Sequence, residues 1–329
     1  MSDASAVLDS PETAPGSEPR REPLQLRVGS FRLHADRWRG GARGHALLLH
    51  GLGGNSITWH AVAPRLAREF GVSVLALDLP GFGASRPGAA GLDLRVLSSV
   101  IEQVLRAEAP AGTRWLLAGN SLGGLLALEL ACRCPERVAA VNLAALALPL
   151  DWGRRGAALG DILRYVPVAL PWQGRRLVEQ YVRSRGVPGV VDDPIRLLFR
   201  DPTRLDAGLR QQLIEVSEYR LTWADEAARA YEQVTRSLGL RLICPRLGAR
   251  WIQRVRCPVQ SIYGTVDPLY PRAAWQRLEQ ARPDWEHVPL HDIGHVPQLE
   301  APHEFSAELS RWLNGAALRG QWLRNQPAL

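Results

Sequence analysis

The segment at residues 119–124, which reads GNSLGG, restricts the fold of this chain more than any other feature of its sequence. The apolar run WLLAG leads into it, and the helical apolar pattern LLALELAC follows it. A serine at a turn from strand to helix adopts strained backbone angles, and the flanking glycines, Gly119 and Gly123, remove side chains that would collide as the chain doubles back. Asn120 and Ser121 then lie at the tip of the turn, where the free N–H groups of a helix N-terminus favour negative charge. The pattern predicts a nucleophilic serine at the end of a strand.

Strand and helix patterns alternate on both sides of this turn. Apolar runs typical of buried strands lie at residues 45–50, 73–78, 114–119, 138–145, 258–264 and 285–289. Helical patterns between or after them lie at residues 59–70, 94–107, 121–133, 272–280 and 303–313. An alternating segment at residues 24–38, centred on Gly29 and Ser30, predicts a β-hairpin before the first of these strands. The alternation predicts an α/β fold with a doubly wound, mostly parallel sheet.

The alternation stops between residues 149 and 255. Helical patterns rich in Arg and Leu and interrupted by prolines replace the apolar strands there, which predicts an inserted helical cap. The interrupting prolines are Pro167, Pro171, Pro188, Pro194 and Pro202. The core then comprises residues 24–148 and 256–314, followed by a C-terminal extension at 315–329. Residues 1–23 are rich in Ser, Pro, Ala and Glu without an apolar run, so we expect a disordered tail.

All 40 basic side chains are arginines, because the sequence contains no lysine. This excludes a P-loop and a Schiff-base lysine. Nineteen arginines and twelve acidic residues lie at 151–256, so the whole net charge of +7 arises in the cap region. A basic cap suits an anionic substrate or a peripheral membrane contact, but a solvated lid covering a core has the same composition, and the sequence leaves both open. No recognition motif accompanies the charge, so we expect no nucleic-acid partner.

The four cysteines, Cys132, Cys134, Cys244 and Cys257, are too few and too scattered for a disulfide framework. The C-x-C pair has no second Cys/His pair at zinc spacing, so we expect no metal, and without a dinucleotide fingerprint we expect no cofactor. No stretch reaches the roughly 18 apolar residues of a membrane span, and the N-terminal segment lacks the apolar region of a signal peptide. We therefore predict a cytoplasmic protein without a transmembrane segment that acts on a small molecule. The sequence leaves its oligomeric state undetermined.

Asp267 and His295 follow later apolar strand patterns, in PVQSIYGTVDP and PLHDIGHVPQLE. Serine alone is too weak an acid to attack a carbonyl group, so a histidine must take its proton and a carboxylate must orient that histidine. The chain order Ser121, Asp267, His295 is the one that a serine turn between strand and helix requires. Two other carboxylates compete for the role of the acid: Asp151, near the end of the preceding strand, and Asp292, three residues before the histidine.

The first apolar strand pattern of the core ends in His50-Gly51-Leu52-Gly53. Glycines let the backbone approach a substrate closely, so the N–H groups of Leu52 and Leu122 are predicted to bind an oxyanion. We expect His50 to order this loop through a hydrogen bond rather than to act as a base.

Together, the segments HG-x-GG, DLPGFGAS, GNSLGG, YG-x-x-D and GH-x-x-x-x-E-x-P resemble the α/β-hydrolase superfamily over residues 24–314. The resemblance implies that fold and a catalytic serine, and it carries Ser121, Asp267, His295, Leu52 and Leu122 into the roles given above. Serine rather than aspartate at the nucleophile position separates the chain from epoxide hydrolases and haloalkane dehalogenases. The chain is most similar to capped bacterial esterases and lipases, with the meta-cleavage C–C hydrolases and cofactor-free haloperoxidases as neighbours.

Two departures bear on the activity that the resemblance implies. The C–C hydrolases share the GNS turn but usually place Trp after the catalytic histidine, where this chain has Val296, and haloperoxidase-like members generally have a smaller cap. We therefore predict hydrolysis of a carboxylic ester of a small or medium-sized apolar substrate, through an acyl-enzyme at Ser121. The alternatives are a C–C hydrolase of the meta-cleavage type and a ligand receptor on the same fold that does not turn over.

Overall fold

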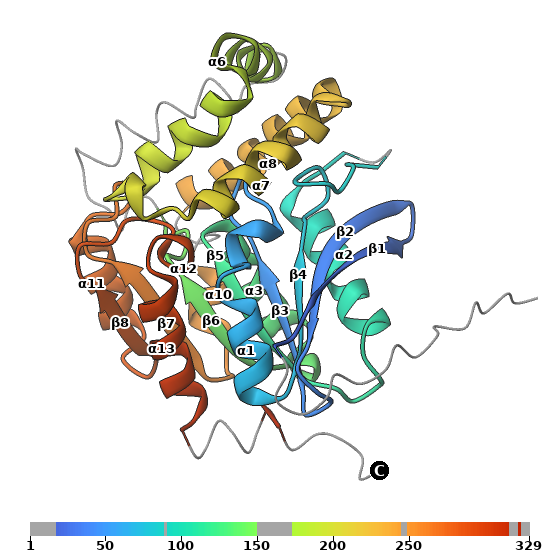
Figure 1. Ribbon diagram of the computed structural model, residues 1–329. Helices are drawn as coiled ribbons and strands as arrows, with labels where there is room; N and C mark the ends of the chain where they lie inside the picture. The colour runs from blue at the N-terminus through green and yellow to red at the C-terminus, as the bar shows by residue number, and fades with distance from the viewer. Residues whose placement is uncertain (1–17, 89–90, 150–172, 245–248, 316–321, 324–329) are drawn as a thin grey trace, which may run out of the picture.

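The computed structural model describes residues 18–88, 91–149, 173–244, 249–315 and 322–323. They form one eight-stranded sheet with helices on both faces and a group of longer helices above the ends of its strands (Figure 1). In chain order the strands are β1 (Arg21–Val28), β2 (Phe31–Arg39), β3 (His45–Leu49), β4 (Ser73–Leu77), β5 (Trp115–Asn120), β6 (Val138–Ala144), β7 (Val259–Gly264) and β8 (Glu286–Leu290). Their order across the sheet is β1-β2-β4-β3-β5-β6-β7-β8.

The sheet is antiparallel at one edge and parallel elsewhere. β1 pairs antiparallel with β2, and β2 pairs antiparallel with β4. The neighbours from β4 to β8 are parallel. Parallel strands are covered on both faces by the helices that connect them, and β5 and β6 are accordingly buried along their whole length. The predicted α/β fold with a doubly wound, mostly parallel sheet is confirmed.

Two apolar layers hold the core helices against the sheet. α1 (Ala63–Phe70) and α13 (Pro302–Leu313) pack on one face. The other face is covered by α2 (Leu94–Ala107), α3 (Leu122–Arg133), α10 (Arg250–Arg254) and α11 (Arg272–Ala281). α3 is buried at every position from its first residue to Ala131. This stretch is apolar except for Glu129, which pairs with Arg133 and Arg241. Its N-terminus therefore has a fixed place beside the carboxyl ends of β3 and β5.

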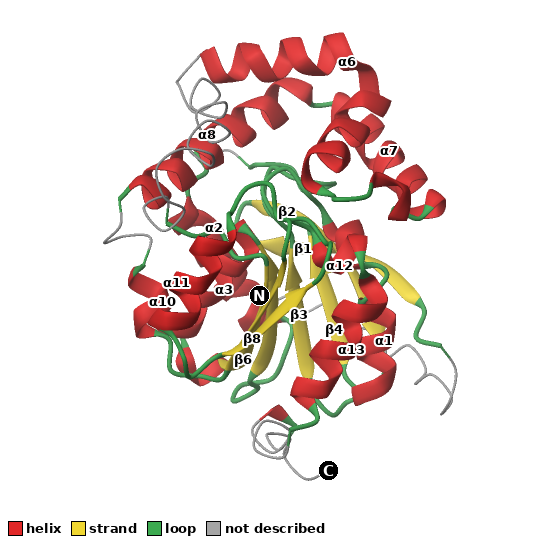
Figure 2. Ribbon diagram, turned by 90° about the vertical axis from the view of Figure 1, so that its left-hand side faces the viewer, coloured by secondary structure: helices red, strands yellow, loops and turns green. Residues whose placement is uncertain are grey.

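The helical cap lies above the carboxyl ends of the parallel strands (Figure 2). It contains α6 (Gln173–Leu198), the short helix η4 (Pro202–Arg204), α7 (Ala207–Leu221) and α8 (Ala224–Ile243). Several of its arginines are paired within the cap, for example Arg185 with Asp193 at 2.6 Å and Arg210 with Asp192 at 2.7 Å.

The break within α6 falls at a glycine rather than at the predicted prolines. Gly186 has φ 63° and ψ 176°, a conformation that only glycine adopts cheaply, and it divides α6 into two stretches. Pro188 lies in the first turn of the second stretch, where a missing N–H costs nothing, and Pro194 lies inside it. The predicted interruption is therefore present beside Pro188, two residues after Gly186, whereas the prediction that Pro194 interrupts a helix is wrong. Pro167 and Pro171 lie outside the described residues.

Two boundaries in the N-terminal part differ from the sequence-based expectation. β1 begins at Arg21 rather than at residue 24, because its register with β2 continues to the pair Arg21 and Trp38. The helix expected at residues 59–70 begins only at Ala63, with Pro64 in its first turn, where a missing N–H is tolerated. The residues before it form a separate short helix, η1 (Ser56–Trp59), which the side chain of Asn55 caps. Among the described residues, no helix combines the length and the apolar character needed to cross a bilayer.

Candidate active site

Ser121 occupies the turn between β5 and α3 with φ 51° and ψ −108°, a conformation that non-glycine residues rarely adopt. The neighbouring glycines allow this turn. A Cβ atom built on Gly119 would lie 2.3 Å from the carbonyl carbon of Gly123, and one built on Gly123 would lie 2.3 Å from the carbonyl oxygen of Leu49. Both separations are shorter than real Cβ atoms tolerate, so these two positions require glycine. The strain of the predicted serine turn is thus present in the backbone.

His295 and Asp267 follow β8 and β7 in the chain, and the structure brings their side chains together. His295 Nδ1 lies 2.7 Å from Asp267 Oδ2, and both side chains are almost fully buried. The other carboxylate oxygen, Oδ1, accepts the N–H groups of Leu269 at 2.8 Å and Tyr270 at 3.2 Å. Backbone donors therefore hold Asp267 in place. A carboxylate at Nδ1 keeps the proton of a neutral imidazole on that nitrogen, which makes Nε2 the acceptor.

The second ring nitrogen of His295, Nε2, is buried and has no hydrogen-bond partner among the described residues. Asn120 ties the histidine loop to the serine turn, because its Nδ2 donates to the carbonyl oxygens of His295 at 3.2 Å and Ala144 at 2.9 Å. Other buried side-chain atoms of the described residues also lack a partner, so the open Nε2 is informative only because Asp267 holds the opposite ring nitrogen, which leaves Nε2 able to accept a proton.

Residues 51–54 pass close to the serine turn. A Cβ atom built on Gly51 would lie 3.5 Å from the Cβ atom of Ser121. Gly53 has φ 76°, and a Cβ atom built on it would lie 3.1 Å from the ring of Tyr231, which belongs to α8 of the cap. The loop therefore lies between the serine and the cap, with glycine at both points of close approach.

His50 orders this loop through both of its ring nitrogens. Nε2 accepts the N–H of Leu79 at 3.0 Å, so Nδ1 carries the proton and donates to the Gly51 carbonyl at 2.7 Å. Burial lowers the pKa of His50, which favours this neutral form. The N–H groups of Leu52 and Leu122 make no hydrogen bond with the described residues; Leu122 is the first residue of α3, so its N–H has no partner within the helix. Both N–H groups are therefore available as donors.

Of the two competing carboxylates, only Asp292 lies in the described part of the chain, and its side chain does not contact His295. Asp292 is exposed and pairs instead with Arg200, whose Nε lies 3.0 Å from its Oδ1. Asp151 lies outside the described residues. In the described ranges, no group of three or more His, Cys, Asp or Glu side chains could hold a metal ion.

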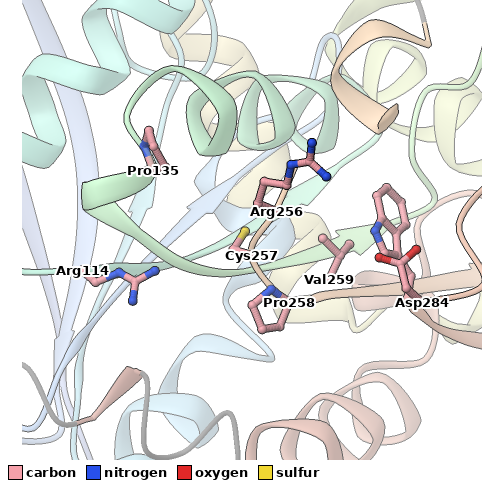
Figure 3. Close-up of a pocket in the computed structure, with 8 residues that line it drawn as sticks. Arg114, Pro135, Arg256, Cys257, Pro258, Val259 and Asp284 are labelled. Atoms are coloured by element: carbon pink, nitrogen blue, oxygen red, sulfur yellow. The ribbon is translucent and has the colours of Figure 1, made fainter. Parts of the chain in front are cut away.

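A separate pocket of about 480 Å³ lies where the parallel strands begin, at the end of the sheet opposite to the serine turn (Figure 3). Its lining includes Arg114, Cys257 and Trp285, which precede β5, β7 and β8. Ser121, Asp267 and His295 all follow their strands, so this pocket is not part of the candidate active site.

Two residues near the site have partners that sequence reasoning did not identify. Tyr231 reaches Gly53 only because the cap folds back over the core, and no local pattern indicates this. In the sequence, Glu300 stands out only as the acid of the GH-x-x-x-x-E-x-P segment. It is buried in the short helix α12 (Pro297–Glu300), and the signal that could have marked it is a single acid in an otherwise uncharged segment, VPQLEAP.

The fold and the site geometry agree with comparisons to known proteins. The model of the alpha/beta hydrolase family matches residues 46–308, so the chain belongs to this family. A pimeloyl-[acyl-carrier protein] methyl ester esterase of Klebsiella pneumoniae subsp. pneumoniae is 27% identical to it, over 80% of this chain and 91% of the relative. The chain is therefore a hydrolase with an esterase among its relatives.

Solved structures with the same fold include lipid and ester hydrolases. A membrane phospholipase A, described as a bacterial virulence factor, superimposes with a TM-score of 0.70 at 24% identity and covers 91% of this chain and 87% of its own. A thermophilic esterase from Thermogutta terrifontis gives a TM-score of 0.63 at 20% identity, covering 89% and 98% of the two chains. Likenesses at these identities establish the fold.

Proposed function

We propose that this hydrolase cleaves carboxylic esters of small or medium-sized apolar substrates through an acyl-enzyme at Ser121. The observation that carries the proposal is the buried pair of Asp267 and His295, which contact at 2.7 Å while His295 Nε2 has no partner among the described residues. Asn120 links that pair to the strained turn of Ser121. The 27% identical methyl ester esterase adds support for the ester as substrate.

In the first half of the reaction, Ser121 Oγ attacks the carbonyl carbon and its proton passes to Nε2 of His295. Asp267 stabilises the imidazolium that forms and keeps the ring oriented. The N–H groups of Leu52 and Leu122 bind the oxyanion of the tetrahedral intermediate, and each such donor contributes about 3 kcal/mol to the transition state. The intermediate collapses when the C–O bond breaks and the alkoxide takes the proton from Nε2, which leaves an acyl group on Ser121.

In the second half, a water molecule takes the place of the alcohol. His295 removes one of its protons as the oxygen attacks the acyl carbon, the same two N–H groups bind the second oxyanion, and Ser121 regains its proton as the acid leaves. An ester needs only one proton delivered to its leaving group. C–C cleavage also needs the substrate held for ketonisation by further polar groups, and the residue after His295 is the apolar Val296, which packs against Phe199 and Leu299.

We also propose that the sheet with its flanking helices acts as the catalytic core and that α6, α7 and α8 form a cap that covers it. The core boundaries expected at residues 24 and 256 shift to Arg21 and Arg250, because β1 begins at Arg21 and α10 packs against the sheet. The cap reaches the site through Tyr231, which packs over the glycine loop at Gly53. Because this cap side chain packs on the loop next to Ser121, we expect the site to favour short and medium acyl chains over long-chain triglycerides.

The test is covalent labelling with a fluorophosphonate, followed by turnover on p-nitrophenyl esters of increasing acyl length. Labelling should occur at Ser121 and be abolished in Ser121→Ala, while Ser99→Ala, which changes an exposed serine of α2, should label like the wild type. Equal labelling of Ser121→Ala would remove the assignment. A labelled protein that ignores all esters but cleaves a vinylogous diketone would be a C–C hydrolase, and one that stops after a single turnover would be a receptor.

A further inference from the structure

The loop of His295 is attached to the cap through one buried carboxylate. Glu300 is only 2% exposed, and each of its carboxylate oxygens accepts backbone N–H groups. Oε2 accepts the N–H of Gly294 at 2.8 Å, directly before the histidine. Oε1 accepts the N–H groups of Arg200 at 2.9 Å and Asp201 at 3.0 Å, directly after α6 of the cap. One side chain thus joins the histidine loop to the end of a cap helix.

A second, direct contact joins the same two segments. The N–H of His295 itself donates to the carbonyl oxygen of Leu198, the last residue of α6, at 2.7 Å. The two backbones are in close contact here, since a Cβ atom built on Gly294 would lie 2.1 Å from that same oxygen and 3.0 Å from the nitrogen of Arg200. The end of α6 therefore cannot shift toward the loop without displacing the histidine.

Apolar packing encloses the junction, and an ion pair lies on its outer surface. Phe199, Val296 and Leu299 form a buried cluster around it. Outside, Arg200 and Asp292 make an ion pair in which both side chains are about 60% exposed (59% and 61%). Exposed pairs of this kind contribute little, so the buried hydrogen bonds of Glu300 and of the His295 N–H, together with this apolar cluster, hold the two segments together.

We propose that Glu300 is a positioning residue, which holds the imidazole of His295 in line with Ser121 only while the end of α6 is docked on the histidine loop. The proposal rests on the proposed function, since it assumes that His295 is the base. Its physical basis is the cost of burying a carboxylate, which is offset only when both oxygens are hydrogen-bonded. Separation of the cap end from the loop would leave one oxygen and up to three N–H groups without partners. The two segments therefore move as one unit, and the cap controls the alignment of the base.

The decisive variant is Glu300→Gln, which keeps the shape of the side chain but replaces one acceptor oxygen with an NH₂ group. That group must face either the Gly294 N–H or the N–H groups of Arg200 and Asp201, so one link between cap and loop is lost. We expect the rate constant for fluorophosphonate labelling of Ser121, and kcat for p-nitrophenyl acetate, to fall by about tenfold to a hundredfold, as expected for an unsatisfied buried donor. KM should change by less than about threefold, because Glu300 does not touch the substrate.

Two controls separate positioning from a general loss of structure. Asp292→Asn removes the exposed ion pair at the same junction and should leave labelling within about twofold of the wild type. Gly294→Ala keeps the carboxylate but forces the two backbones apart, and it should reproduce the kcat loss of Glu300→Gln. Each variant is compared with the wild type by thermal unfolding, and rates are measured well below the melting temperature so that unfolded protein does not contribute.

Amide hydrogen exchange of the wild-type protein supplies a measurement that needs no variant. The amides of Arg200 and Asp201 on the cap side and of Gly294 and His295 on the loop side should be protected to within about tenfold of one another, because they open together. Cap-side amides that exchange far faster than the loop-side amides would overturn the proposal. So would folded Glu300→Gln and Gly294→Ala proteins that label Ser121 at the wild-type rate. A wild-type protein that fluorophosphonate does not label would instead refute the proposed function, and the exchange result would still stand on its own.

Discussion

Replacing Asp267 by asparagine should place the proton of His295 on the wrong nitrogen, and the structure explains why. In the native protein, Oδ1 of Asp267 accepts two backbone N–H groups, from Leu269 and Tyr270, while Oδ2 faces His295 Nδ1. In the Asp267→Asn variant, the amide oxygen of the new side chain would keep the two N–H donors, which turns its NH₂ group toward Nδ1. That nitrogen must then accept, so the ring proton moves to Nε2, where it blocks removal of the proton of Ser121.

The magnitude follows from the cost of the opposite amide orientation. Turning the NH₂ group toward Leu269 and Tyr270 would restore the productive tautomer but leave two buried N–H groups facing a donor, at about 1–3 kcal/mol each. A total of about 2–6 kcal/mol corresponds to a productive fraction reduced between about 30-fold and 10⁴-fold. The upper end agrees with the loss of about 10⁴ in kcat known for this change in serine proteases.

The assay is kcat/KM on p-nitrophenyl acetate for Asp267→Asn beside Asp292→Asn. The first variant should lose at least about 30-fold and keep its melting temperature within a few degrees, because the two backbone hydrogen bonds survive. The second should retain activity, since Asp292 is exposed and pairs with Arg200. An Asp267→Asn protein with more than a third of the wild-type activity would refute the tautomer argument, and a large loss in Asp292→Asn would move the acid to that residue.

Two further predictions concern stability. Gly123→Ala should lower the free energy of unfolding by about 3 kcal/mol or more, because the added methyl group would meet the Leu49 carbonyl, whereas Gly239→Ala, in open space on α8, should raise it by about 0.5–1 kcal/mol; urea unfolding compares the two, and similar effects would contradict the packing argument. Burial and the charge of Arg37 lower the pKa of His45 to about 4. The unfolded chain binds a proton below about pH 6.5 but the folded chain does not until about pH 4, so stability should fall as the pH drops across this window. His45→Phe should flatten that fall, and an unchanged pH slope would show that another group causes it.

Much of the architecture could be predicted because it depends on short-range patterns. Apolar runs of five to seven residues separated by amphipathic helices predict a parallel sheet, since each strand must be buried on both faces. The GNSLGG turn predicts its own backbone strain, because the contacts that exclude side chains at Gly119 and Gly123 involve residues a few positions away or in the adjoining strand. Ser121, Asp267 and His295 each follow an apolar strand pattern, which predicts that all three lie at the same end of the sheet.

What the sequence determined by itself is therefore the sheet, the serine turn and a short set of candidate residues. The tertiary structure decided which candidates meet: Asp267 lies 2.7 Å from His295, while Asp292, closer in the chain, turns outward to Arg200. It also decided that Glu300 bonds to Arg200, a hundred residues earlier in the chain. These outcomes are not encoded locally, because a hydrogen bond depends on the directions in which two distant backbones arrive, and only the docking of the cap on the core sets those directions.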